Sequence, residues 1–221
     1  MNTLQSIWNG LDWSYLLNIV LSVVPSLLCI TFHEVSHGYV AYRLGDTTAK
    51  DAGRLTLNPL KHIDPMGLLM MVVFKFGWAK PVPVNPNYFK KPKQGMAVTA
   101  LAGPVSNLLL AILLLLIARG VYIRAALTGS FSATWFALLL DTASLSVGLG
   151  LFNLVPIPPL DGSKVLAVLL PDRAYDWLMH YERFGMLVLV MVISVGIGSN
   201  ALDNAIRWTF TMLCRLVGFE V

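Results

Sequence analysis

The sequence predicts an all-α polytopic membrane protein with about four to six transmembrane helices and a small re-entrant β segment. The first observation is composition, since 56% of the 221 residues are hydrophobic and 13% are charged, against about 25% charged in soluble domains. The second is a mean hydropathy of +0.68. The third is a series of long apolar stretches, because a helix needs about 20 such residues to cross a bilayer. Together they argue against a soluble globular domain.

The predicted spans follow the apolar stretches in order. They are residues 15–42, 95–118, 134–152 and 184–198. Residues 66–74 are also apolar but too few to cross as a helix, so we expect a re-entrant or interfacial segment there. The tail, residues 201–221, mixes charged with large apolar side chains, a pattern typical of an interfacial helix.

The basic residues predict the orientation of these spans. The formal net charge of +4 does not indicate nucleic-acid binding, because lysine and arginine gather in loops between apolar stretches, where they report orientation. If residues 43–93 and 153–183 face the cytoplasm, twelve of the 16 basic residues lie inside and four outside. We therefore expect a multi-pass protein of the cell membrane with no nucleic-acid partner.

A metal-binding pattern lies inside the first predicted span. His33, Glu34 and His37 form the pattern H-E-x-x-H, and residues four apart share one helical face, so both imidazoles can reach one metal ion. Glu34 lies beside that ion and can take a proton from a bound water, as zinc hydrolysis requires. The alternative is three buried groups that satisfy one another, but ionisable residues within a bilayer are costly and usually functional.

A catalytic zinc site usually has three protein ligands, so one more is needed. Asp161 is the strongest candidate, because prolines at positions 156, 158 and 159 stop regular helix just before it. A loop at membrane depth is tolerated where it is buried in protein or lines water, and such a loop could bring this carboxylate to the histidine pair. The alternative is that Asp161 only caps a helix that starts near Ser163.

These motifs resemble the site-2 protease family, the zinc intramembrane metalloproteases, in its short form without a PDZ domain. The resemblance rests on residues 33–37, 102–107 (AGPVSN) and 153–162, with further matches at 53–67 and 77–86. It implies hydrolysis of peptide bonds within or near transmembrane segments. It also implies one zinc ion per chain, bound by His33, His37 and Asp161, with Glu34 as the catalytic base.

The resemblance also sets the expected domain organisation. We expect residues 1–221 to form a single integral-membrane metalloprotease domain. Its catalytic core covers about residues 14–170, and a C-terminal span with an amphipathic tail occupies residues 184–221. The active site is expected toward the cytoplasmic side of the membrane.

Two asparagines are further candidates. The developing oxyanion of peptide hydrolysis needs a hydrogen-bond donor besides zinc, and Asn153 is the candidate because its amide sits near the metal-binding loop and the resemblance implies a similar role. Asn107 follows Gly103 and Pro104, where backbones can approach closely. We expect Asn107 to line a water-filled cavity and contact the substrate, although an interhelical hydrogen bond is an equal alternative.

Two segments predict the small re-entrant sheet. Residues 54–58, which carry Leu55 and Leu57, alternate polar and apolar side chains, a strand pattern. In residues 81–84 the prolines block hydrogen bonding on one edge only, which suits an edge strand carrying the candidate substrate contacts Val82 and Val84. A substrate helix must unwind before cleavage, and the sheet could add it as a further strand. The alternative is a loop on the membrane surface.

Two rival functions are a zinc-binding membrane transporter and a non-catalytic protein that binds transmembrane helices. A transporter would spread polar ligands along a path through several helices, whereas here they gather at one depth. Glu34 argues against a pure binder, since metal binding alone does not require it. The expected partners are transmembrane protein substrates and the lipid bilayer, and the sequence leaves open a homo-oligomer or a regulatory membrane partner.

Overall fold

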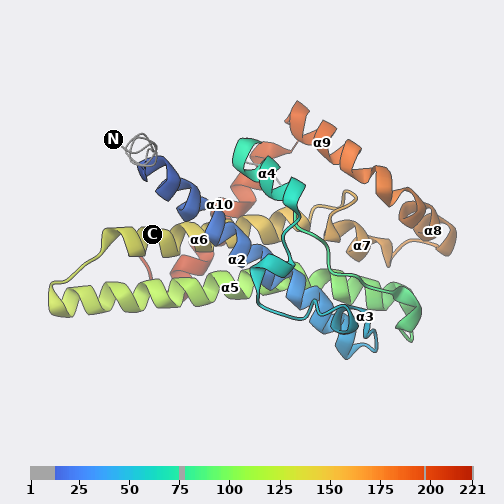
Figure 1. Ribbon diagram of the computed structural model, residues 1–221, viewed down its shortest axis with the longest axis horizontal. Helices are drawn as coiled ribbons and strands as arrows, with labels where there is room; N and C mark the ends of the chain where they lie inside the picture. Colours follow the sequence, from blue (N-terminus) through green and yellow to red (C-terminus); the bar gives the residue numbers. More distant parts are fainter. Residues whose placement is uncertain (1–12, 75–77, 197, 221) are drawn as a thin grey trace, which may run out of the picture.

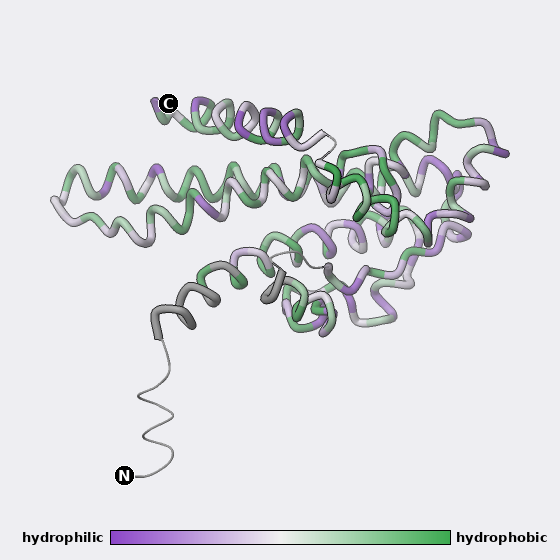
Figure 2. The backbone as a smooth tube through the Cα atoms, turned by 90° about the horizontal axis from the view of Figure 1, so that it is seen from above, coloured by the Kyte–Doolittle hydropathy of each residue, from purple (hydrophilic) through white to green (hydrophobic). Residues whose placement is uncertain are grey.

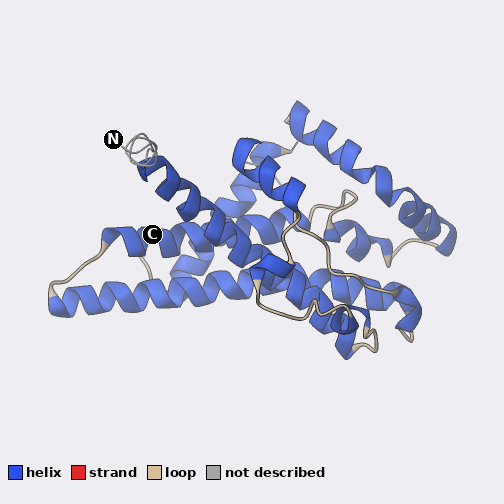
Figure 3. Cartoon of the chain, viewed as in Figure 1, coloured by secondary structure: helices blue, strands red, loops and turns tan. Residues whose placement is uncertain are grey.

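The computed structural model describes residues 13–74, 78–196 and 198–220, and helices dominate it (Figures 1 and 3). The α-helices are α2 (Trp13–Arg43), α3 (Thr48–Asp51), α4 (Pro65–Phe74), α5 (Pro92–Thr128), α6 (Ala133–Asn153), α7 (Asp161–Ala167), α8 (Asp172–Tyr181), α9 (Gly185–Val195) and α10 (Ser199–Val217). Short 3-10 helices lie at η1 (Pro59–Lys61), η2 (Pro86–Tyr88) and η3 (Glu182–Phe184).

The helices α5 and α6 form an antiparallel hairpin along the long axis of the molecule (Figure 1). Within the described residues, these two are long and apolar enough to cross a membrane, and Figure 2 shows the hairpin coloured mainly as hydrophobic. Few charged residues interrupt these two helices. Most of the charge of the chain lies in the connections around α3, α7 and α8. The hairpin indicates a membrane protein, and the total of four to six spans stays a prediction.

The core lies where α2 and α10 pack on the hairpin. Buried apolar side chains from all four helices meet there: Cys29, Leu110, Ala111, Leu114, Leu115, Ala143, Val147, Cys214 and Val217. Small residues on α5 and α6 let the helices approach closely, since a Cβ added at Gly150 would lie 3.1 Å from the Pro104 carbonyl oxygen. This contact brings α6 close to α5 beside the polar residues described below.

The predicted helices are present, with different lengths at the C-terminal side. Residues 15–42 fall within α2 and residues 134–152 within α6, while 95–118 lie inside the longer α5. The segment predicted as a span at 184–198 forms only the eleven-residue α9, about 16 Å long at 1.5 Å per residue. Gly196, with φ +73°, follows the last residue of α9 and favours a helix end, and residue 197 lies outside the described residues.

The tail is a helix that packs on the rest of the protein. One face of α10 buries Cys214 and Val217 in the core, and Figure 2 shows the helix running alongside the α5–α6 hairpin. The ring of Phe219, beyond its end, meets Tyr122 and Phe136 from the two hairpin helices. The expected helix is therefore observed, and it belongs to the packed body of the protein.

The predicted small sheet is absent from the described residues. Residues 54–58 are irregular with a bend at 56–57, and residues 81–85 belong to no strand. The only backbone bridge in the described part joins Ile63 to Ala79. The strand partners are engaged elsewhere: the Arg54 guanidinium donates to the Lys80 carbonyl oxygen at 2.6 Å, and the Val82 N–H donates to a side chain of α2. The described residues therefore do not confirm the expected sheet.

Candidate metal centre

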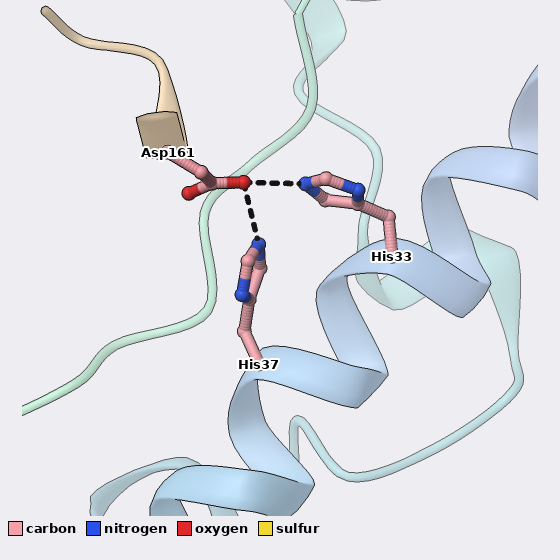
Figure 4. Close-up of side chains that lie close together, drawn as sticks. All are labelled: His33, His37 and Asp161. Carbon is pink, nitrogen blue, oxygen red and sulfur yellow. Dashed lines mark hydrogen bonds and ion pairs between the residues drawn. The ribbon is translucent and has the colours of Figure 1, made fainter. Parts of the chain in front are cut away.

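The histidine pair lies in the C-terminal part of α2. His33 and His37 are one turn apart and their rings meet edge to face, with centroids 4.5 Å apart. Both side chains are largely buried, and Figure 4 shows them pointing from the same face of the helix toward a carboxylate. The helix thus places two imidazoles side by side, as the four-residue spacing predicts.

A tight turn brings the carboxylate to them. After α6 ends, residues 154–160 reverse the chain and α7 begins at Asp161. Gly162 permits this turn, because an added Cβ would lie 2.1 Å from the Leu154 carbonyl oxygen. The Ser163 hydroxyl then donates to the Leu160 carbonyl oxygen at 2.7 Å. Asp161 therefore faces α2 and has no role as a simple surface cap.

The three candidate ligands converge on one point. The Oδ2 atom of Asp161 lies 3.0 Å from Nε2 of His33 and 3.1 Å from Nε2 of His37, and the possible ligand atoms all lie within 4.8 Å of one another. Burial alone would raise the pKa of the Asp161 carboxyl, but hydrogen bonds from the two histidines outweigh it and hold that pKa below its usual range. The three side chains are thus arranged so that a single ion could contact all of them.

The far side of each imidazole meets α5. The Nδ1 atom of His37 lies 2.7 Å from the Thr99 carbonyl oxygen, to which a neutral ring donates its Nδ1–H. The Nδ1 atom of His33 lies 3.3 Å from the side-chain amide of Asn107. Histidines that bind zinc usually hydrogen-bond through their other nitrogen in this way, which fixes the ring and the free Nε2 lone pair.

These residues fit a zinc ion. Two imidazole nitrogens and one carboxylate oxygen are a donor set found in catalytic zinc sites, where a fourth position stays open for water or substrate. The two Nε2 atoms face the Asp161 carboxylate, while the two Nδ1 atoms already contact groups of α5. Chemically, such a site can bind a divalent metal and present it to a neighbouring cavity.

Glu34 faces that cavity and is bound by the extended segment opposite. Its Oε2 atom accepts a hydrogen bond from the backbone N–H of Val82 at 2.9 Å. The cavity has a volume of about 730 Å³, and its lining includes the two histidines, Glu34 and Asp161. A candidate base and the candidate ligands therefore line one cavity.

The other candidates from the sequence divide into two groups. Val82, Val84 and Asn153 line the cavity, and one amide N–H of Asn153 donates to the Leu149 carbonyl oxygen of its own helix at 2.9 Å. Leu55 packs beside Gly38 on α2, and Leu57 is 61% exposed. Neither leucine lines the cavity, because the sheet expected to place them there does not form.

Asn107 also lies away from the cavity. It is fully buried between α5, α6 and α2, and of the two roles left open for it, the interhelical hydrogen bond matches the observed contact with His33. It therefore lies beside His33, a candidate ligand, and does not line the cavity.

Sequence reasoning missed three features of the site. The Thr99 carbonyl and the Val82 N–H are backbone groups, and no side-chain pattern identifies them. The third is an ion pair at the cavity wall, where the Lys164 ammonium lies 3.0 Å from a Glu182 carboxylate oxygen and joins α7 to η3. The sequence signal for this ion pair was the presence of opposite charges, Lys164 and Glu182, in the residues that follow Asp161.

Comparison with known protein families agrees with this geometry. Residues 21–196 match the peptidase family M50, which is more than half of the chain. The chain belongs to peptidase family M50. This M50 peptidase is accordingly a zinc metalloprotease, in agreement with the site-2 protease resemblance of its motifs.

Relatives support the same assignment. YwhC of Bacillus subtilis (strain 168), named as a candidate zinc metalloprotease, is 42% identical over 188 residues, which covers 81% of this chain and 83% of the relative. Rip2 of Mycolicibacterium smegmatis, named in the same way, is 29% identical over 203 residues, covering 89% and 75%. The zinc metalloprotease MJ0392 of Methanocaldococcus jannaschii is 25% identical over 170 residues, covering 77% and 38%. No solved structure matches significantly.

Gly103 gives a direct test of the metal centre. A Cβ at this position of α5 would lie 2.5 Å from Nε2 of His37 and 2.6 Å from Cε1 of His33, so Gly103→Ala should displace both rings and weaken zinc binding at least about tenfold. Gly120→Ala on the same helix is the matched control, since nothing lies within 4 Å of its Cβ. Zinc content and chelator competition on purified protein measure the effect. Equal zinc binding by the two variants would contradict this geometry.

Proposed function

We propose that this metalloprotease cleaves peptide bonds within or near transmembrane segments of membrane proteins. The observation that carries the proposal is the cavity lined by His33, His37, Asp161 and Glu34 beside two apolar helices of membrane-spanning length. A substrate segment that reaches this cavity approaches from the bilayer. Family membership favours proteolysis over zinc transport.

The chain's own residues have distinct parts in this reaction. We propose His33, His37 and Asp161 as the ligands of one zinc ion, which supplies an acidified water and polarises the scissile carbonyl. Glu34 takes a proton from the attacking water and delivers a proton to the amide nitrogen as its C–N bond breaks, which leaves a carboxyl and an amine product. The second N–H of the Asn153 amide is the proposed donor to the developing oxyanion.

The extended segment 81–84 is proposed to hold the unwound substrate. Groups two residues apart in an extended chain point to the same edge, so the N–H of Val84 points to the side on which the Val82 N–H meets Glu34. Both residues line the cavity. The nitrogens of Pro81 and Pro83 carry no hydrogen, so the edge of the segment that faces away from the cavity lacks these donors. Strand pairing is therefore favoured on the edge that faces the cavity. Leu55 and Leu57 lie outside the cavity, and Leu55 packs beside Gly38 next to the side chain of Val82.

Cleavage of a single-span model substrate in detergent tests the main proposal. Wild-type protein should cut it, while Glu34→Gln should keep about one zinc per chain and lose cleavage by at least about 100-fold, because the proton acceptor is gone. Asp203→Asn on the remote helix α10 is the control and should cut normally. If all three hold zinc and none cuts any of a panel of helices, a binder of transmembrane helices becomes the better account.

Val84→Pro tests the substrate-holding segment. It removes one N–H from the cavity edge, so kcat/KM should fall roughly 3- to 10-fold, the value of one hydrogen bond of about 0.5–1.5 kcal/mol. Val84→Thr keeps the N–H and a branched side chain and serves as the matched control. Steady-state kinetics on the same substrate measure both. Equal kinetics for the two variants would argue against strand addition at this edge.

We also propose a multi-pass cell-membrane location with the active site toward the cytoplasm, from the bias of basic residues. With both native cysteines replaced, Ser130→Cys between α5 and α6 should react with an impermeant maleimide on intact cells. Lys91→Cys, at the start of α5, should react only after permeabilisation. The reverse labelling pattern would reverse the proposed orientation.

A further inference from the structure

Asn107 lies in the protein interior against one of the proposed ligands. Its side chain is fully buried, and its amide nitrogen is placed 3.3 Å from Nδ1 of His33. Its amide oxygen is buried and has no hydrogen-bond partner among the described residues. A buried, unpartnered amide oxygen is costly, because it loses its bond to water without a replacement.

The position of the proton on the His33 ring determines how the Asn107 amide must be oriented. The Nε2 atom of His33 faces Asp161, so it is the atom that would bind zinc, and it must then be free of its proton. In the neutral ring the proton is on Nδ1, which needs an acceptor. The nitrogen and oxygen of an asparagine amide are nearly isosteric, and their assignment follows from the hydrogen-bond network. Rotation of the Asn107 amide by 180° gives the Nδ1–H of His33 an acceptor and places the amide N–H groups where the unpartnered oxygen now lies.

We infer that Asn107 is a positioning residue of the metal site: its Oδ1 atom accepts the Nδ1–H of His33 and fixes the tautomer and ring orientation that present Nε2 to zinc. The inference rests on the ligand assignment made above. It extends to the second histidine, because the Thr99 carbonyl of α5 accepts from Nδ1 of His37. Helix α5 thus orients both imidazoles and contributes no ligand of its own.

The position of Asn107 is held independently of its amide. The Ser146 hydroxyl of α6 donates to the Asn107 backbone carbonyl oxygen at 2.8 Å. Gly150 of α6 lies against the same turn, since its added Cβ would be 3.4 Å from the Asn107 Cβ. Contacts with α6 therefore fix the position of Asn107 on α5, and its amide faces His33.

Zinc affinity tests the inference without any reliance on activity. The variants are Asn107→Leu, which removes the hydrogen bond, and Asn107→Asp, which keeps an acceptor of the same shape and has no N–H. Ser146→Ala is the matched control, since it disturbs the same helix contact and leaves the amide in place. Zinc dissociation constants come from chelator competition in detergent, and visible spectra of the Co²⁺-substituted proteins report ligand geometry.

We expect Asn107→Leu to weaken zinc binding by about 10- to 100-fold and to change the Co²⁺ spectrum, while Asn107→Asp and Ser146→Ala stay close to wild type. If Asn107→Leu binds zinc as tightly as wild type, or if Asn107→Asp is as weak as Asn107→Leu, the inference is overturned. A wild-type chain that holds no zinc overturns it together with the ligand assignment. A wild-type chain that holds zinc and cuts no substrate counts against the proposed function alone.

Discussion

The meeting of one carboxylate with two imidazoles inside an apolar body is the constraint on which this structure depends. Asp161 and the pair His33 and His37 come from segments far apart in the chain, and an ionised carboxylate at such a place is costly unless it is paired. The turn before α7, the small residues of α5 and the course of α2 all serve to bring these groups within about 3 Å. Everything else in the site is arranged around that contact.

The hairpin helix α5 has an unusual share in that arrangement. It carries none of the candidate ligands, yet its backbone passes so close to α2 that position 103 has no room for a side chain. The same helix offers Thr99 and Asn107 to the far sides of the rings. The orientation of the two imidazoles therefore comes from the packing of α5 against α2, while the turn before α7 places the carboxylate.

Local features of this site could be predicted from the sequence, and long-range ones only in part. The spacing of His33 and His37 determines a shared helical face, and the proline-rich turn indicates where a loop delivers Asp161. Strand pairing between residues 54–58 and 81–84 failed as a prediction, because alternation describes one segment and says nothing of its partner. Arg54 and Glu34 bind the backbone of the second segment instead. From the sequence, Asn107 was expected to line a cavity. Its contact with His33 could not be predicted, because that contact depends on how α2 and α5 cross.

The separation of the ligands along the chain has a consequence for the life of the protein in the cell. Asp161 and His33 are 128 positions apart, so a metal ion bound between them closes a long loop and joins α7 to α2 in the manner of a cross-link. Stability gained in this way rises with the concentration of free metal. The turn at 154–160 and α7 are then the part of the chain whose attachment to α2 would depend most directly on a bound metal ion.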